Sequence, residues 1–324
     1  MSRLATVHVL SLNCLNNQWN QSDFEGTSVK LIEWNYTLLS PVLTYKLMRL
    51  QQKENYDVIH SHLTHAQLHS ALLSLLPLHC KWITTEHSNN NNRRDKGYLN
   101  IFDKWLYSRF DKVFSVSSSV QKNLLAWLGK SADNRFKVFP NGVDVAKIRK
   151  AKALDRMSYG YTSDDKLIIM VGRFEDAKDQ MTLVRCLEYL PSSYKVILVG
   201  DGSLRAACEA LTKELKLANR VFFAGAQSNV PSWLKMCDIY VQSSHWEGMP
   251  TSVMEAMAAE LYVFGSKVSG NTDVLTNEAM FEHSNAKDLA RLILTADSSF
   301  KKKQKEIITK YDMSALAQKL LAEY

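Results

Sequence analysis

The sequence lacks the cysteine patterns of disulfide-rich or zinc-binding proteins. It has five cysteines and no CxxC pair, and an odd number cannot all be paired within one chain. We therefore expect scattered thiols and a reducing cytoplasmic setting rather than a disulfide framework. The five are Cys14, Cys80, Cys186, Cys208 and Cys237.

Long apolar runs and internal repeats are also missing. The longest apolar stretch lies near residues 71–78, far short of the roughly 20 residues that a membrane-spanning helix needs. The chain does not open with a basic segment followed by an apolar one, so we expect no secretory signal. These absences argue against an integral membrane or secreted protein.

What the chain does contain is ordinary globular composition with an uneven charge. Its 324 residues suggest two domains, and 46% of them are hydrophobic. Residues 1–150 carry 19 basic and 11 acidic side chains, whereas the rest carries 21 and 22. The basic first half favours an anionic partner, such as an acidic saccharide or the inner surface of the cell membrane, with a generally basic surface as the alternative.

Short β-rich runs alternate with segments of helical length, which is typical of parallel sheets built from βαβ units. We expect strands at 7–12, 29–34, 58–62, 82–87, 113–117, 137–139, 167–171, 195–199, 221–224, 239–242 and 262–266. The turn sequence PNGVD near residue 141 predicts a boundary between domains. The expected domains are 1–145 and 146–298, followed by two helices in 299–324 that could pack back on the first domain.

The strongest chemical signal is the segment 243–260, SSHWEGMPTSVMEAMAAE. It places Glu247 on a loop after an expected strand, and Glu255 follows eight positions later in a helix that should begin near Ser252. Ser252 and Glu255 also fit a capping box, so helix capping is an alternative role for Glu255. The amides between the two carboxylates, at Gly248, Met249, Pro250 and Thr251, would lie at a helix N-terminus, where anions bind.

A second segment, 170–184, ends a buried strand at Gly172 and then places Arg173 and Lys178 near a helix start. Two cations at a strand end suit a diphosphate, because arginine offers a fork and lysine a compact charge. Surface ion pairs with neighbouring acids are the alternative for each residue. A third segment, 196–211, contains GDG but lacks the full phosphate-loop patterns, so we expect a tight strand–helix turn.

Histidines cluster in the first half. His60 and His62 share an expected strand, His65 follows them, and His87 ends another strand after Glu86. A metal site is one reading of this spacing, although no HExxH motif or cysteine accompanies it. Ordinary core or surface histidines are the simpler alternative. His87, at the carboxyl end of its strand, is the best single candidate for contact with a substrate.

Taken in order, these segments resemble the retaining glycosyltransferase family four, the glycosyl transferases group 1, which have the GT-B fold. The matching pieces lie between residues 57 and 270 and read DVIHSH, TTEH, VFSVSSSV, FPNGVD, VGRFEDAKD, LVGDGSLR, VFFAG and SSHWEGMPTSVMEAMAA. The resemblance implies an α/β protein with two Rossmann-like parallel-sheet domains facing a central cleft. It also implies that the N-terminal domain is incomplete, because the family's first strand, Gly-rich turn and helix have no counterpart here.

The resemblance further implies roles for single residues. Arg173 and Lys178 would bind the diphosphate of a nucleotide-sugar, Glu255 the ribose, and Glu247 would face the transferred sugar. Gly172 and the amides of residues 248–251 would line the same site, and His87 would reach the sugar from the first domain. No metal or other cofactor is expected. Three departures stand near the site: Glu260 in place of a glycine, Tyr262 in place of a proline, and Asp273 in place of a glutamate.

The expected function is therefore the transfer of a sugar, with retention, to a saccharide or lipid-linked acceptor in cell-envelope polysaccharide synthesis. The expected location is the cytoplasm, as a peripheral protein at the inner membrane surface. The alternative is a catalytically impaired, glycosyltransferase-like binding protein or fragment, because the first strand–helix unit is missing. Nucleic-acid binding is not expected, since no basic motif with interleaved aromatics occurs.

Overall fold

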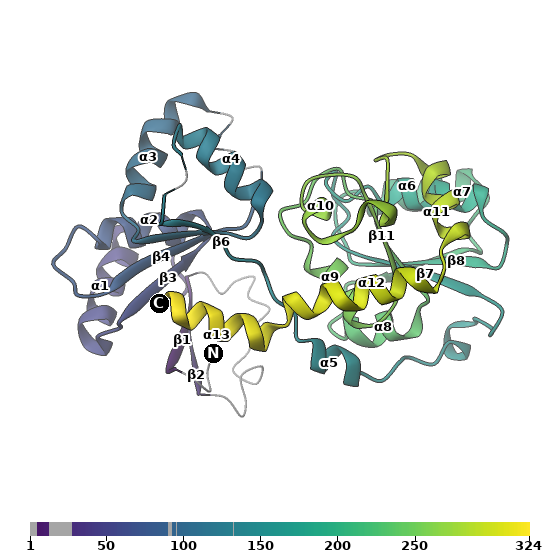
Figure 1. Cartoon of the computed structure of the whole chain (residues 1–324), viewed down its shortest axis with the longest axis horizontal. Coiled ribbons are helices and arrows are strands. Elements are labelled where there is room, and N and C mark those ends of the chain that lie inside the picture. Colours follow the sequence, from purple (N-terminus) through teal and green to yellow (C-terminus); the bar gives the residue numbers. More distant parts are fainter. Residues whose placement is uncertain (1–4, 13–27, 90–92, 95, 132) are drawn as a thin grey trace. The chain divides into compact units, whose positions relative to one another are not determined.

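The structure is a computed structural model that describes residues 5–12, 28–89, 93–94, 96–131 and 133–324. Cys14 lies outside these ranges. The chain divides into two compact units (Figure 1). Unit 1 comprises Met1–Pro140 and Ser314–Tyr324, and unit 2 comprises Asn141–Met313. We describe each unit by itself.

The described strands of unit 1 form two parallel sheets. The smaller pairs β1 (Val7–Ser11) with β2 (Val29–Glu33), and the larger has the order β3-β4-β5-β6. Its strands are β3 (Val58–His62), β4 (Lys81–Glu86), β5 (Lys112–Ser115) and β6 (Phe136–Val138). The helices are α1 (Pro41–Glu54), α2 (Thr64–Leu73), α3 (Asn100–Ser108), α4 (Ser118–Leu128) and α13 (Met313–Glu323), with the 3-10 turn η3 (Gly97–Leu99). A core that includes Leu106, Phe110, Val113 and Leu124 packs α2, α3 and α4 on the larger sheet.

Unit 2 contains one six-stranded sheet in the order β12-β11-β10-β7-β8-β9, and every recorded pair is parallel. Its strands are β7 (Lys166–Val171), β8 (Tyr194–Val199), β9 (Val221–Gly225), β10 (Ile239–Gln242), β11 (Tyr262–Ser266) and β12 (Met280–Phe281). Its helices are α5 (Val145–Lys150), α6 (Gln180–Cys186), α7 (Arg205–Glu214), α8 (Val230–Met236), α9 (Thr251–Ala258), α10 (Asn271–Val274), α11 (Ala286–Thr295) and α12 (Ser298–Ile308). Four 3-10 turns complete it: η4 (Met157–Tyr159), η5 (Leu187–Tyr189), η6 (Asn277–Ala279) and η7 (Thr309–Tyr311).

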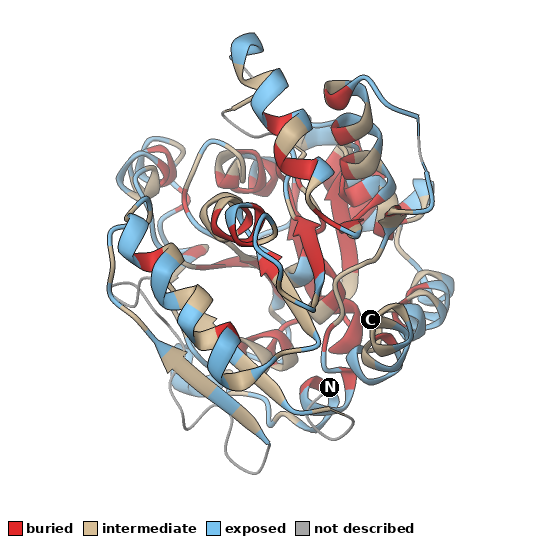
Figure 2. Ribbon diagram, turned by 90° about the vertical axis from the view of Figure 1, so that its left-hand side faces the viewer, coloured by how far each residue is buried: buried red, intermediate tan, exposed pale blue. Residues whose placement is uncertain are grey.

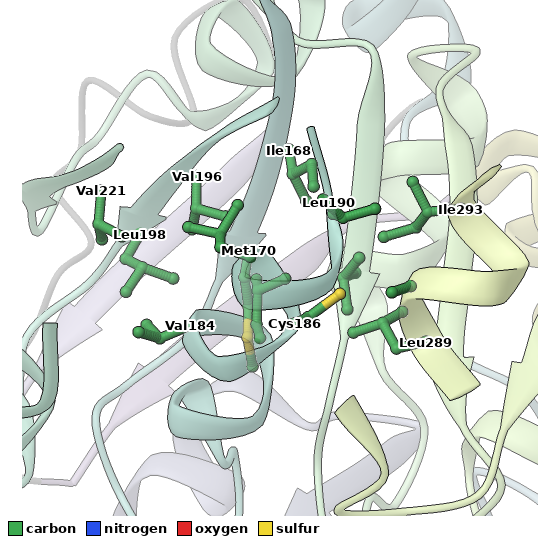
Figure 3. Close-up of a cluster of buried hydrophobic side chains, with 14 of the residues drawn as sticks. Ile168, Met170, Val184, Cys186, Leu190, Val196, Leu198, Val221, Leu289 and Ile293 are labelled. Carbon is green, nitrogen blue, oxygen red and sulfur yellow. The ribbon is translucent and has the colours of Figure 1, made fainter. Parts of the chain in front are cut away.

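The core of unit 2 follows from strand alternation. Ile168 and Met170 on β7 lie beside Val196 and Leu198 on β8, and all four face a cluster shared with α6 and α11 (Figure 3). The intervening residues, such as Ile169 and Ile197, are also fully buried. Both faces of these strands are therefore covered, as expected for parallel sheets with helices on each side. Buried residues are concentrated on such strands and the helix faces packed on them (Figure 2).

All eleven expected strands are present, each within two residues of its predicted ends. The strand β12 was missed because two residues are too short to show a period. Within the described ranges, no helix is both long and apolar enough to cross a membrane.

The expected third segment, 299–324, is divided between the units and is not a separate part. Helix α12 stays in unit 2, where Gln304 donates a hydrogen bond to the carbonyl of Val263 at 2.7 Å. Helix α13 belongs to unit 1, where Glu323 forms ion pairs with Lys112 and Lys137, both at 2.7 Å. The boundary near the middle falls between Pro140 and Asn141.

Candidate functional site

The candidate site of unit 2 is built at the carboxyl ends of β7 and β10. These strands are parallel neighbours, with Ile239 opposite Ile168. The segment that leaves β7 at Gly172 and the segment that leaves β10 at Ser243 therefore begin at the same edge of the sheet, where open α/β sheets bind ligands.

Lys178 and Glu247 meet at this edge. The ammonium of Lys178 lies 2.6 Å from Oε1 of Glu247, and the carboxylate is buried. The same oxygen accepts hydrogen bonds from Nε2 of Gln242 and Oγ of Ser244, both at 2.6 Å. Three donors on one oxygen hold the carboxylate in one orientation, because any rotation of the Glu247 side chain would break several hydrogen bonds.

Two glycines allow this arrangement. A Cβ on Gly172 would lie 3.4 Å from Cδ of Lys178, so the lysine stem packs directly over the glycine. Gly270 has a φ of +86°, and a Cβ there would lie 2.6 Å from Cβ of Glu247. The loop that carries Gly270 is thus pressed against Glu247, and Ser269 accepts a hydrogen bond from the amide of Glu247 at 3.2 Å.

Glu255 and Glu247 both lie close enough to the buried Tyr240 to act on its hydroxyl. Tyr240 is fully buried, and both Glu247 and Glu255 act electrostatically on its hydroxyl and raise its pKa, after the larger effect of burial. The Tyr240 hydroxyl and Oγ of Ser252 both donate to Oε1 of Gln242. Burial also raises the pKa of Glu255, while Lys147 opposes that shift.

The expected capping box is wrong. Helix α9 begins at Thr251 and its N-cap is Pro250, with no side-chain cap. Ser252 lies inside the helix and its hydroxyl turns toward Gln242, at 3.3 Å. Helix capping therefore does not account for Glu255.

The loop before α9 leaves its amides available. Among the described residues, the N–H groups of Gly248, Met249 and Thr251 donate no hydrogen bond, and Pro250 has no N–H. Met249 and Pro250 are buried, whereas Thr251 is exposed. N–H groups that donate no hydrogen bond, at a helix N-terminus and next to a lysine, are suited to bind an anionic group.

Arg173 lies outside this network. Its side chain is 78% exposed and forms an ion pair with Glu175 at 3.1 Å. This is the surface ion pair that the sequence left open as the alternative role of Arg173.

The GDG segment forms the expected tight turn. Gly200 and Gly202 have φ values of +136° and +155°, and a Cβ on either would overlap the backbone of Gly172 or Phe174.

His87 lies in unit 1, at the end of β4, beside two other histidines. Its Nε2 lies 2.8 Å from Nδ1 of His62, and the ring of His62 stacks on His60. His65 takes no part in these contacts. Within the described residues, no group of three or more His, Cys, Asp or Glu side chains is placed to hold a metal ion.

The histidines of unit 1 make its stability depend on pH. Burial, with repulsion from His62 and His87, lowers the pKa of His60 to about 3, and the pKa values of His62 and His87 are also lowered. A group with a depressed folded pKa contributes stability above its unfolded pKa, near 6.5, and that stability is lost as the pH falls. We expect the protection factors of the amides in β3 and β4, which compare the observed exchange rates with the intrinsic ones, to fall as the pH is lowered from 7 to 4.5. We expect His60→Gln to make this fall smaller, and an equal fall in wild type and variant would contradict the expectation.

Two family models match the chain. Residues 152–311 match glycosyl transferases group 1, and residues 6–147 match glycosyltransferase family 4. The chain belongs to glycosyltransferase family four. The structure is similar to that of Anabaena HepE in complex with UDP, with a TM-score of 0.81, 19% identity, and coverage of 94% of this chain and 88% of that one. The fold is accordingly GT-B, with parallel sheets and flanking helices in both units.

Curated relatives of this family-four chain are also glycosyltransferases. An uncharacterized glycosyltransferase of Methanocaldococcus jannaschii is 25% identical over 272 residues, which cover 79% of this chain and 66% of the relative. A galactosyltransferase of Escherichia coli, named for UDP-Gal and a diphosphoundecaprenol acceptor, is 26% identical over 72% of this chain and 63% of its own length. The chain thus spans less than two thirds of the length of these relatives.

Sequence reasoning did not find Gln242, Tyr240 or Gly270. Gln242 had a usable signal, because it is a polar residue at the end of an otherwise apolar buried strand. Gly270 had none, since its need for a positive φ follows from contact with Glu247, 23 positions earlier.

Proposed function

We propose that this chain transfers a sugar from a nucleotide-diphosphate sugar to a saccharide or lipid-linked acceptor, with retention at the anomeric carbon and without a metal. The observation that carries the proposal is the Lys178–Glu247 pair, fixed by Gln242 and Ser244 beside the N-terminus of α9. Membership of a glycosyltransferase family supports the reaction class. Lipid-linked and envelope acceptors are suggested by the names of relatives, among them the Escherichia coli galactosyltransferase.

In the proposed reaction, the bond between the anomeric carbon and the diphosphate oxygen breaks and the nucleoside diphosphate leaves. Lys178, Arg173 and the N–H groups of Gly248, Met249 and Thr251 offset the negative charge that develops on the leaving group. Glu247 faces the sugar and its growing positive charge, which resembles that of glycoside hydrolysis. The acceptor hydroxyl attacks from the face that the diphosphate leaves, and its proton passes to the departing phosphate oxygen.

The donor nucleotide is proposed to lie along the same edge, with its ribose hydroxyls on Glu255. The rotamer of Arg173 seen here, paired with Glu175, must then change on binding. A swing of this kind costs little, because an exposed ion pair contributes only about 0–1 kcal/mol. His87 of unit 1 is proposed to contact the transferred sugar.

The direct test is product analysis by NMR after incubation with UDP-sugars and a lipid-diphosphate saccharide acceptor, with excess EDTA in a parallel sample. We expect an α-linked product from an α-linked donor, at an equal rate with EDTA. An inverted product would refute retention, and a rate abolished by EDTA and restored by Mg²⁺ would refute metal independence. UDP binding with no turnover on any acceptor tried would favour the binding-protein alternative.

Glu255→Gln tests the ribose contact. Hydrogen bonds to a charged carboxylate contribute about 1.5–3 kcal/mol, so we expect the Kd for UDP to rise roughly tenfold or more. Isothermal titration calorimetry measures it, and Glu214→Gln on the exposed face of α7 is the matched control. An unchanged Kd would remove Glu255 from the nucleotide site.

A further inference from the structure

Two histidines meet at the ends of neighbouring strands in unit 1. His62 ends β3 and His87 follows the last residue of β4, and these strands are paired with His62 opposite Thr85. The two rings approach with Nδ1 of His62 2.8 Å from Nε2 of His87. Among the described residues, the outer nitrogens, Nε2 of His62 and Nδ1 of His87, have no protein partner.

A third histidine holds the first of them in place. The ring of His60 stacks on that of His62 with centroids 4.4 Å apart. Both nitrogens of His60 are occupied: Nε2 lies 2.7 Å from Oγ1 of Thr85, and Nδ1 lies 2.6 Å from the hydroxyl of Tyr324. His60 therefore cannot rotate without losing two hydrogen bonds, and it forms a fixed platform under His62.

The protonation of the pair follows from its surroundings. Burial lowers the pKa values of all three histidines, repulsion from neighbouring histidines adds to this for His60 and His62, and Glu86 partly opposes it for His87, so the rings are neutral at pH 7. The other charged group near His87, Glu86, is already bound to Tyr107 and Arg94. In a neutral pair only one of the two facing nitrogens can carry a proton. If His62 donates, both rings are protonated at Nδ1, and if His87 donates, both are protonated at Nε2.

We propose that His62 is a positioning residue that fixes the ring orientation and the tautomer of His87, with His60, Thr85 and Tyr324 as its support. The inference rests on the proposed function, in which His87 contacts the transferred sugar. One fixed tautomer presents either a donor or an acceptor at the outer nitrogen of His87, and so selects how a sugar hydroxyl must be oriented.

The first experiment does not need turnover. Long-range ¹H–¹⁵N spectra of histidine-labelled protein at pH 7 report the tautomer of each ring, and single His→Gln variants assign the signals. We expect His62 and His87 to be neutral and to share one tautomer, and His62→Phe to bring the ¹⁵N shifts of His87 toward averaged values. Opposite tautomers, a charged ring, or shifts of His87 that His62→Phe leaves unchanged would overturn the inference.

The second experiment measures its effect on transfer. A lost hydrogen bond of ordinary strength predicts a kcat about tenfold lower in His62→Phe, with the Kd for UDP unchanged. His62→Asn, which can still offer an amide to His87, should recover most of that loss, and the exposed His79→Phe should lose nothing. Equal loss in His62→Phe and His62→Asn would overturn the positioning role. If wild type shows no transfer at all, the proposed function fails while the tautomer result still decides the inference.

Discussion

Replacing Lys178 by alanine is expected to lower kcat/KM for the nucleotide-sugar by about 10²–10³-fold, since loss of one electrostatic stabiliser of a developing anion costs roughly 2.7–4 kcal/mol. Lys178 is the lysine that the structure places against Glu247, over Gly172, at the edge where the diphosphate is proposed to leave. Most of the loss should be in kcat, because the charge that Lys178 meets is greatest in the transition state. Steady-state kinetics with a UDP-sugar measures both constants.

The control for this variant must separate chemistry from folding. Glu247 keeps Gln242 and Ser244 as donors when Lys178 is removed, so the carboxylate should stay in place and thermal unfolding should change little. Lys213→Ala, an exposed lysine on α7, should leave both activity and stability unchanged. A Lys178→Ala enzyme within threefold of wild type would remove the lysine from the leaving-group site.

Replacing Gly270 by alanine is expected to destabilise unit 2 by roughly 2–4 kcal/mol and to impair transfer as well. The new methyl would lie 2.6 Å from Cβ and 2.7 Å from the carbonyl oxygen of Glu247, at a φ of +86°. Backbone atoms cannot give way as a flexible side chain can, so either Glu247 or the loop that carries Gly270 must shift, and we expect the contact between Glu247 and Lys178 to be disturbed. Chemical denaturation and kcat together report the two effects.

Gly160→Ala is the matched control for the backbone cost. Gly160 also has a positive φ, +78°, but nothing lies within 4 Å of a Cβ placed there. It should lose only the left-handed strain, about 1–2 kcal/mol, and keep full activity. If Gly270→Ala costs no more than Gly160→Ala and transfers sugar normally, the contact between Gly270 and Glu247 is not important for the site.

The central strands of unit 2 could be predicted because they are buried on both faces. Runs such as 167–171 and 196–199 are continuous Leu, Ile, Val and Met, and each is followed by a glycine where the chain turns. The pairing of Lys178 with Glu247 agrees with the placement of both segments after parallel strands, which puts them at one edge of the sheet. Local sequence is sufficient for conclusions of this kind.

The remaining features depend on contacts between distant positions. Ser252 and Glu255 have the spacing of a capping box, but the N-cap of α9 is Pro250, two positions before Ser252, and the serine hydroxyl donates to Gln242. The platform under His62 needs Tyr324, 264 positions from His60. The sequence left open that the helices in 299–324 pack back on the first domain, but it did not indicate that α13 does so while α12 stays in unit 2, because this depends on the tertiary contacts of Glu323 with Lys112 and Lys137.

The place of α13 has a consequence for how the protein is made. The first 140 residues of unit 1 are synthesised before any of unit 2, whereas their partners Glu323 and Tyr324 follow it. Lys112, Lys137 and His60 therefore lack these partners while unit 2 is translated and folds as a unit. Unit 1 can complete its packing only after unit 2 has been made, so the folding of unit 1 spans the synthesis of both units.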